Sequence, residues 1–166
     1  MTEGVADMEV ERARDAVSAV PDPEIPVITI ADLGILRGVE RRDGAIVVTL
    51  TPTYTGCPAT RAIRLDVEAA LAQAGIASAK VETVLSPAWS TDDITQEGKD
   101  KLRAYGIAPP AQRTGKAALL FADPTIASPR CGSTNTTRIS EFGSTPCKAL
   151  WRCENCREPF DVFKCL

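Results

Sequence analysis

The sequence predicts a two-layer α/β (α+β) domain followed by a small β domain of the zinc-ribbon kind. Helical and strand-like patterns alternate along the first 108 residues, whereas five of the six cysteines follow residue 130. Between these parts, residues 109–125 contain Pro and Gly without a regular apolar period, as is typical of a linker. We therefore expect domains at residues 1–108 and 126–166, joined by that linker.

The first domain is expected to begin with an amphipathic helix and a β-hairpin. Apolar residues recur at helical spacing over residues 8–20, and Pro21 ends that pattern. Asp43-Gly44 then stands between two strand-like segments, residues 35–41 and 45–51. This dipeptide is a strong signal for a two-residue hairpin turn.

Further helices and strands complete both domains. Pro58 suits the first turn of a helix, and Gly75 and Gly106 suit the ends of helices. The expected elements of the first domain are a helix at 59–74, a strand at 81–85 and a helix at 95–105. Those of the tail are strands at 136–142, 148–152 and 160–164.

Composition excludes several classes of activity. The chain has no histidine, which rules out Ser-His-Asp and Cys-His catalysis and histidine-based zinc or di-iron centres. We therefore expect an accessory protein rather than an enzyme. A net charge of -3 gives no electrostatic reason to bind nucleic acid. No signal peptide or membrane-spanning stretch is recognisable, so we expect a cytoplasmic location.

Cys57 stands alone between a strand and the helix predicted to follow Pro58. A helix N-terminus carries unpaired N–H groups and a partial positive charge, which stabilise the thiolate that binds metal. Cys57 is therefore a candidate metal ligand, with a small buried thiol as the alternative. Asp22 and Glu24 lie in a proline-framed loop and are either hard ligands for the same metal or turn formers.

The tail contains the spacing of a metal-binding knuckle. Two residues separate Cys153 from Cys156, so their thiolates can bind one tetrahedral ion. Residues 128–132 have the shape of a second knuckle, in which Cys131 is the second ligand but Ser128 occupies the first position. A neutral hydroxyl is a poor zinc ligand, so we expect a three-thiolate site, with a purely structural ribbon as the alternative to a functional one.

Cys147 and Cys165 form a possible second thiol pair. They lie six residues before Cys153 and nine after Cys156. Along extended strands these separations place them together at the other end of the ribbon. Three interpretations remain open: a metal site completed by outside ligands, a redox disulfide, or thiols packed in the core.

Several motifs resemble a known family. They are Asp22-Pro23-Glu24-Ile25-Pro26-Val27, Asp32-Leu33-Gly34, Gly56-Cys57-Pro58, Pro87-Ala88-Trp89-Ser90 and Gly106-Ile107-Ala108-Pro109-Pro110. Their order and spacing over residues 8–110 resemble the SufT/MIP18-like family of metal–sulfur cluster biogenesis. With the tail motifs at 139–145, 147–150 and 157–161, nearly the whole chain resembles the PaaD/PaaJ family of accessory components of phenylacetyl-CoA epoxidases (phenylacetate-CoA oxygenases).

The resemblance implies an accessory subunit of aerobic phenylacetate degradation. Such a subunit would mature or deliver an iron or iron–sulfur centre to the epoxidase complex, with the di-iron oxygenase or its iron–sulfur reductase as partner, and a homodimer is compatible with it. Cys57 would be the family's reactive or metal-binding cysteine. Cys131, Cys153 and Cys156 would be three of four zinc ligands, with Ser128 in place of the fourth.

Three other functions compete with that one. The first is a structural subunit that docks oxygenase components without handling metal. The second is an electron-transfer domain, which needs a permanent cluster. A nucleic-acid-binding ribbon is the least favoured, because the whole chain is acidic.

Overall fold

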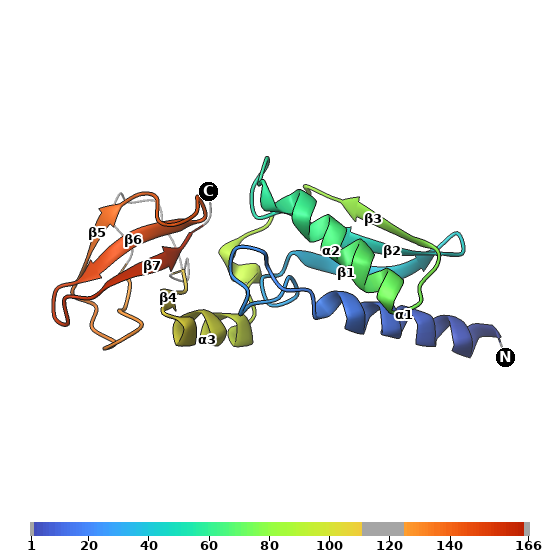
Figure 1. Cartoon of the computed structure of the whole chain (residues 1–166), viewed down its shortest axis with the longest axis horizontal. Helices are drawn as coiled ribbons and strands as arrows, with labels where there is room; N and C mark the ends of the chain where they lie inside the picture. The colour runs from blue at the N-terminus through green and yellow to red at the C-terminus, as the bar shows by residue number, and fades with distance from the viewer. Residues whose placement is uncertain (1, 111–124, 165–166) are drawn as a thin grey trace. The chain divides into compact units, whose positions relative to one another are not determined.

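The computed structural model describes residues 2–110 and 125–164, with side chains from residue 8 onward. The chain divides into two compact units, Met1–Trp89 and Ser90–Leu166. Each unit has its own sheet (Figure 1).

The first unit is a two-layer arrangement of two helices and a three-stranded sheet. The strands are β1 (Leu36–Arg42), β2 (Ala45–Leu50) and β3 (Ala79–Thr83), in the order β1-β2-β3. The helices are α1 (Thr2–Ser18) and α2 (Ala59–Gln73). Helix α1 packs along β1 and beside α2, and α2 packs along β3 (Figure 1). The predicted first helix is confirmed, with different ends.

The predicted hairpin between β1 and β2 is also confirmed. Asp43 and Gly44 have φ values of 51° and 79°, so both turn residues adopt the left-handed conformation. A turn with two left-handed residues matches the twist of antiparallel strands, and Asp and Gly tolerate that conformation better than other residues do. The turn sequence therefore fixes the pairing of Arg42 with Ala45.

Strands β2 and β3 are parallel, so the chain must cross over between them. Helix α2 makes the crossover, and its buried residues Ile63, Val67 and Leu71 fall at helical spacing. Strand β2 is buried along nearly its whole length, as expected for the central strand of the sheet. The junction from β2 to α2 carries Cys57.

The second unit begins with a short 3-10 helix η1 (Thr91–Asp93) and α3 (Gln96–Tyr105). Its sheet has the order β4-β7-β6-β5, with antiparallel pairing except between β4 and β7, which are parallel. The strands are β4 (Ile107–Ala108), β5 (Thr136–Ser140), β6 (Lys148–Cys153) and β7 (Pro159–Phe163). The ribbon core is built from these strands and the segment before β5; its buried members are Ala108, Ile126, Ala149, Trp151, Cys153, Phe160 and Val162.

Strand β4 has no counterpart in the sequence prediction. Ile107 and Ala108 pair with Asp161 and Val162 of β7, and both are buried. The structure therefore groups α3 and β4 with the second unit, whereas the predicted limit at residue 108 places them in the first domain. The predicted linker at 109–125 falls mainly on residues 111–124, outside the described residues, so the limits of 1–108 and 126–166 stay predictions.

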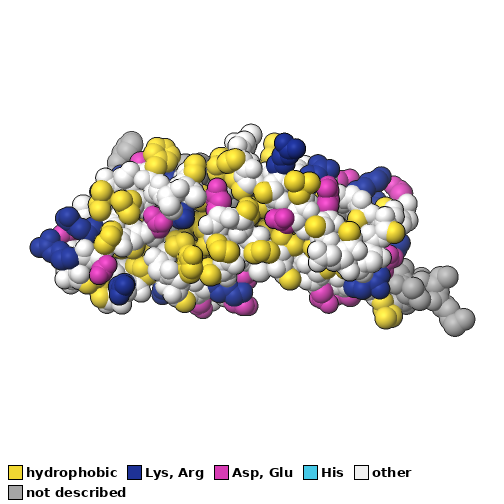
Figure 2. Space-filling view, viewed as in Figure 1, with side chains coloured by type: hydrophobic (Ala, Val, Ile, Leu, Met, Phe, Trp, Pro, Cys, Tyr) yellow, Lys and Arg dark blue, Asp and Glu magenta, His cyan; other side chains and the backbone are white. Residues whose placement is uncertain are grey.

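Acidic and basic side chains are interspersed over the face drawn in Figure 2. At the left end of that view, where Figure 1 places the turn between β6 and β7, basic side chains gather. In the described part of the chain, no helix is long and apolar enough to cross a membrane.

Candidate metal centre

Two short loops of the second unit have the same backbone geometry. In the first loop, the N–H of Gly132 donates to the carbonyl of Ser128, and in the second, the N–H of Arg157 donates to the carbonyl of Cys153, both at 2.9 Å. Gly132 and Arg157 are also both left-handed, with φ values of 73° and 65°. The loops are therefore two equivalent knuckles.

The backbone hydrogen bonds that close the two knuckles match as well. The N–H of Ser128 donates to the carbonyl of Ser133 at 2.9 Å, and the N–H of Cys153 donates to the carbonyl of Glu158 at 3.0 Å. The knuckles are joined by the Asn135 amide, which donates to Asn155 Oδ1 at 2.9 Å. Residues 128 and 153 thus occupy corresponding first positions, and residues 131 and 156 corresponding second positions.

The knuckles bring three thiols together. The sulfur atoms of Cys131, Cys153 and Cys156 all lie within 4.8 Å of one another, and those of Cys131 and Cys153 are 3.5 Å apart. Two sulfurs bound to one tetrahedral zinc ion at about 2.3 Å lie about 3.8 Å apart. The three thiols therefore fit the ligand set of zinc, and the structure brings these predicted ligands together.

Ser128 stands at the sequence position of the fourth ligand. Its side chain is 3% exposed, and Oγ lies 3.9 Å from Cys156 Sγ. Oγ also accepts the backbone N–H groups of Arg130 and Cys131, at 3.3 and 3.4 Å. The hydroxyl therefore points into the centre as a cysteine sulfur would, but a neutral hydroxyl lacks the charge of a thiolate, so it does not fit as the fourth zinc ligand.

The knuckle surroundings shift the thiol pKa values. The backbone N–H of Cys156, assisted by that of Asn155 and by the neighbouring thiols, lowers the pKa of Cys153 to about 7 in spite of its burial. The backbone N–H of Glu158 acts to lower the pKa of Cys156, but burial and the thiols of Cys131 and Cys153 raise it overall. Backbone donors thus favour one thiolate within the trio, as suits a metal ligand.

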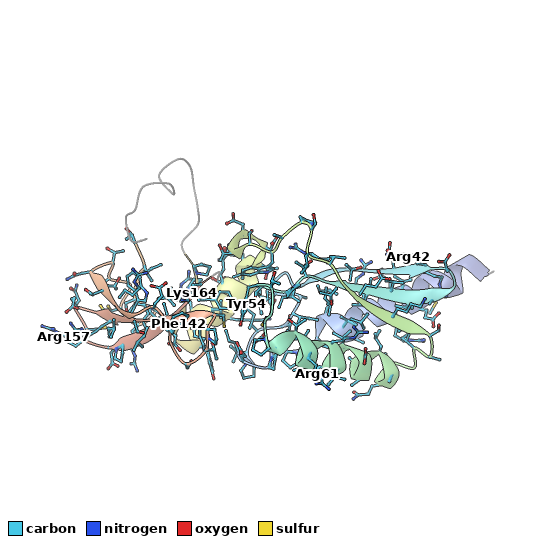
Figure 3. All side chains as sticks on the ribbon, turned by 90° about the horizontal axis from the view of Figure 1, so that it is seen from above. Arg42, Tyr54, Arg61, Phe142, Arg157 and Lys164 are labelled. Atoms are coloured by element: carbon cyan, nitrogen blue, oxygen red, sulfur yellow. The ribbon has the colours of Figure 1, made fainter. Side chains whose placement is uncertain are left out.

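Acidic and basic groups surround the second knuckle. Arg152 and Arg157 both pair with Glu154, at 2.8 and 3.3 Å, and the side-chain hydrogen bond from Arg152 is the main reason that the pKa of Glu154 is lowered. Arg157 projects outward from the turn between β6 and β7 (Figure 3). This end of the ribbon therefore presents arginine side chains to the solvent close to the thiols.

Cys57 lies where the sequence predicted it, directly before α2. Gly56, with a φ of 85°, reverses the chain, and the carbonyl of Cys57 accepts the N–H of Thr60 at 3.1 Å. No side chain caps the N-terminus of α2, and Pro58 has helical backbone angles. The thiol is partly exposed rather than sealed in the core. The first N–H groups of α2 are therefore not occupied by a capping side chain.

Asp22 is part of the proline-framed loop that also holds Glu24. Asp22 Oδ1 accepts the N–H groups of Glu24 and Ile25, both at 2.9 Å, so this carboxylate shapes the proline-framed turn. Among the described residues, the group of three possible ligands within 4.8 Å is the trio of the ribbon knuckles. A metal site shared by Cys57, Asp22 and Glu24 stays a prediction.

Cys147 lies at the opposite end of β6 from the knuckle. It is buried, its sulfur is 3.1 Å from Thr145 Oγ1, and its carbonyl accepts the N–H of Lys164 at 2.9 Å. Cys165 lies outside the described residues. The pairing of Cys147 with Cys165 therefore stays a prediction.

A polar cluster beside Cys147 has no local signature in the sequence. Lys148 is buried and pairs with Asp161 at 3.7 Å, and Ser144 donates to the same carboxylate at 3.1 Å. Next to it, Lys164 Nζ lies 4.2 Å from the ring centroid of Phe142, whose side chain is 58% exposed (Figure 3). Phe142 therefore lies at the surface of the ribbon and not in its core.

Comparison with known proteins places the chain in a family. A family model described as the PaaD zinc beta ribbon domain matches residues 112–164. A protein of Escherichia coli (strain K12), named as the D component of a "Putative 1,2-phenylacetyl-CoA epoxidase", is 47% identical over 162 residues, which is 98% of this chain and 96% of that protein. The chain belongs to the PaaD family. The ribbon with its knuckles is thus a PaaD zinc ribbon in which serine stands at one ligand position.

The first unit of this PaaD-family chain is similar to iron–sulfur assembly proteins. A family model described as iron-sulfur cluster assembly protein matches residues 11–85. The "Fe-S protein maturation auxiliary factor" of Porphyromonas gingivalis is 36% identical over 80 residues, 47% of this chain and 75% of that protein. The fold is shared with a domain-of-unknown-function (DUF59) protein of Bacillus anthracis, at 26% identity and a TM-score of 0.55, covering 60% of this chain and 96% of that one. The predicted fold class, a SufT/MIP18-like domain followed by a zinc-ribbon-like domain, is confirmed.

Proposed function

We propose that this chain is a non-catalytic accessory subunit of aerobic phenylacetate degradation that matures or delivers an iron or iron–sulfur centre. Its client is a component of a phenylacetyl-CoA epoxidase complex, either the di-iron oxygenase or its iron–sulfur reductase. The metal or cluster is cargo in this proposal, which the chain holds briefly and passes on.

The observation that carries the proposal is the joining of two domains in one chain. A cluster-assembly type of domain precedes a ribbon of the PaaD kind, and the E. coli relative named as an epoxidase component matches across both. A domain of the assembly type is suited to handling metal. A ribbon of the PaaD kind would direct that activity to one particular complex. The absence of histidine supports an accessory rather than a catalytic role.

Within the first unit, Cys57 is the residue best suited to hold the cargo. Its thiol is partly exposed, so a metal centre can reach it without unfolding the chain. It also lies next to the N-terminus of α2, whose first N–H groups no side chain caps. One thiolate binds weakly on its own, which suits transfer, and a second copy of the chain or a client residue would complete the coordination.

The ribbon has a separate role in this proposal. The three thiols are built into knuckles at one end of the sheet, so a metal there stabilises the ribbon fold. A folded ribbon presents fixed side chains, such as Phe142, to the epoxidase components. The first unit then handles the cargo and the second unit selects the client.

The proposal is tested by replacing the thiol that holds the cargo. Cys57→Ser should leave the fold unchanged but lower the iron content and activity of epoxidase components that are co-produced with it. The matched control is Thr55→Ala, an exposed change in the same loop. Both variants are compared by circular dichroism and by metal analysis of the purified components. Fully metallated, active components alongside Cys57→Ser would exclude delivery through this residue.

One observation favours a second function, a docking subunit that does not handle metal. Phe142 is exposed on a loop fixed by hydrogen bonds, because the N–H of Gly143 donates to the carbonyl of Lys148 at 2.6 Å and Lys164 binds the carbonyl of Glu141. Rigid exposed aromatic side chains are frequent anchors of protein interfaces.

The docking function makes its own prediction. Phe142→Ala should weaken co-purification with the epoxidase components, whereas Ile139→Ala, which also changes an exposed apolar side chain of the ribbon, should not. If docking is the whole function, co-purification is lost in Phe142→Ala, whereas client metal content stays normal in Cys57→Ser.

A further inference from the structure

We propose that the ribbon centre of this chain is a three-thiolate metal site whose fourth coordination position is open to an exchangeable outside ligand. Ser128 does not bind the metal in this proposal. It stands at the sequence position of the missing cysteine and donates a hydrogen bond to the thiolate of Cys156. The inference concerns the second unit alone and stands whether or not Cys57 carries cargo.

The two knuckles are equivalent in their backbone geometry. Ser128 and Cys153 share the same backbone hydrogen bonds, to residues four and five positions later. A cysteine at position 128 would therefore complete a four-thiolate tetrahedron with the trio that already lies within 4.8 Å. Compared with a cysteine at this position, Ser128 lacks the thiolate but keeps the backbone geometry of the knuckle.

Hydrogen bonds already engage the Ser128 hydroxyl. Its oxygen accepts two backbone N–H groups, from Arg130 and Cys131. An oxygen engaged by two donors has little lone-pair capacity left for a cation, but it keeps its own proton to donate. Cys156 Sγ lies 3.9 Å away, and hydrogen bonding to a ligating sulfur is a recognised way of adjusting a metal site.

The three ligand cysteines differ in their exposure to solvent. Cys131 is exposed and Cys156 is partly exposed, while Cys153 is buried. Two of the three ligand residues are therefore at least partly accessible to solvent, so a small outside ligand can reach a soft divalent cation bound by the trio. Zinc sites with three protein ligands keep their fourth position for water or another small donor. The class of ligand expected here is a small soft or neutral donor such as a free thiol or imidazole.

The experiment uses the full chain, stripped of metal under reducing conditions and titrated with Co²⁺ as a coloured probe for zinc. The variants are wild type, Ser128→Ala and Ser128→Cys, with circular dichroism as the check on folding. Each Co²⁺ complex is then titrated with imidazole while the visible and near-ultraviolet absorption is recorded. The intensity of sulfur-to-cobalt charge transfer reports the number of thiolates, and a shift of the visible bands reports exchange of the fourth ligand.

We expect the bands of wild type and Ser128→Ala to shift on adding imidazole, with charge transfer of equal intensity in the two. Ser128→Cys should give stronger charge transfer and no shift. It should also bind Co²⁺ more tightly by at least about 100-fold, since losing only an outer partner of a ligand already costs about 10–100-fold. If Ser128→Cys fails to fold, the comparison of wild type with Ser128→Ala still decides whether the hydroxyl is a ligand.

Three results would overturn the proposal. The first is wild-type absorption that equals that of Ser128→Cys, which would mean that another cysteine fills the position. The second is a wild-type complex that imidazole does not change. The third is a chain that binds no Co²⁺ until cysteine is introduced at position 128.

Discussion

Arg157 occupies in the second knuckle the backbone position that Gly132 occupies in the first. Both residues are left-handed, and each donates its N–H to the carbonyl four residues earlier. Glycine adopts this conformation at no steric cost, whereas other residues pay for it. The two knuckles therefore have the same geometry with different residues at this position. The steric cost of each residue can be measured as a change in stability.

Gly132→Ala should destabilise the ribbon by about 1–2 kcal/mol, because alanine at a φ of 73° brings its Cβ too close to the following carbonyl oxygen. Chemical denaturation of the zinc-loaded chain measures the effect. Gly38→Ala is the control, since no atom lies within 4 Å of its added Cβ and its φ is not positive. The reciprocal change Arg157→Gly should be neutral or stabilising, and a loss of stability there would contradict the explanation.

Gly143→Ala should disturb the polar cluster under Phe142. An added Cβ would lie 2.6 Å from Asp161 Oδ1 and 3.3 Å from Lys148 Cβ, so the carboxylate must move away from its partners. Overpacking of this kind typically costs about 1–3 kcal/mol. The double variant with Asp161→Ala should be less destabilised than the sum of the two single changes, because the contact then has no partner. Additive effects in a denaturation cycle would mean that the contact is not the cause.

Trp89→Phe should lower the stability of the first unit. The indole N–H donates to the carbonyl of Leu33 at 2.7 Å, and Trp89 is 6% exposed. Phenylalanine keeps an aromatic ring but leaves that buried carbonyl without this donor, a loss of about 1–3 kcal/mol. The midpoint of urea unfolding measures it. Leu85→Ala, at a side chain that is 58% exposed, serves as the control and should change stability by less than about 0.5 kcal/mol.

Removal of metal should unfold the ribbon and leave the first unit intact. The three thiols hold two loops that local hydrogen bonds alone stabilise weakly, whereas β1, β2 and β3 have a separate apolar core with α1 and α2. Hydrogen exchange after treatment with a chelator should therefore accelerate in β5–β7 and stay slow in β1–β3. Unchanged protection of β6 in the metal-free chain would show that packing around Trp151 and Phe160 is sufficient.

Local signals accounted for most of the elements. Asp43-Gly44 predicts its hairpin turn and Gly106 the end of α3, because the residues that adopt left-handed angles are few. The Cys153–Cys156 spacing predicts its knuckle for a similar reason, since the geometry of one metal ion sets it. In each case the information lies within a few residues of the feature.

The failures concern contacts between distant parts of the sequence. Strand β4 is two residues long and pairs with β7 more than fifty residues later, which no local pattern reveals. The predicted strand at 136–142 ends earlier, at Ser140, because a register shift between Arg138 and Ser140 interrupts its pairing with β6, and Phe142 beyond it is exposed.

The parallel pairing of β4 with β7 determines which truncated fragments of this protein keep a protected sheet edge. A fragment that begins at residue 126 would lose Ile107 and Ala108 and would expose the backbone of β7 along one edge of the sheet. Uncovered edges recruit strands from other molecules. Excised ribbons that start there should therefore aggregate, whereas fragments that start at Ser90 keep the protecting strand and the helix before it.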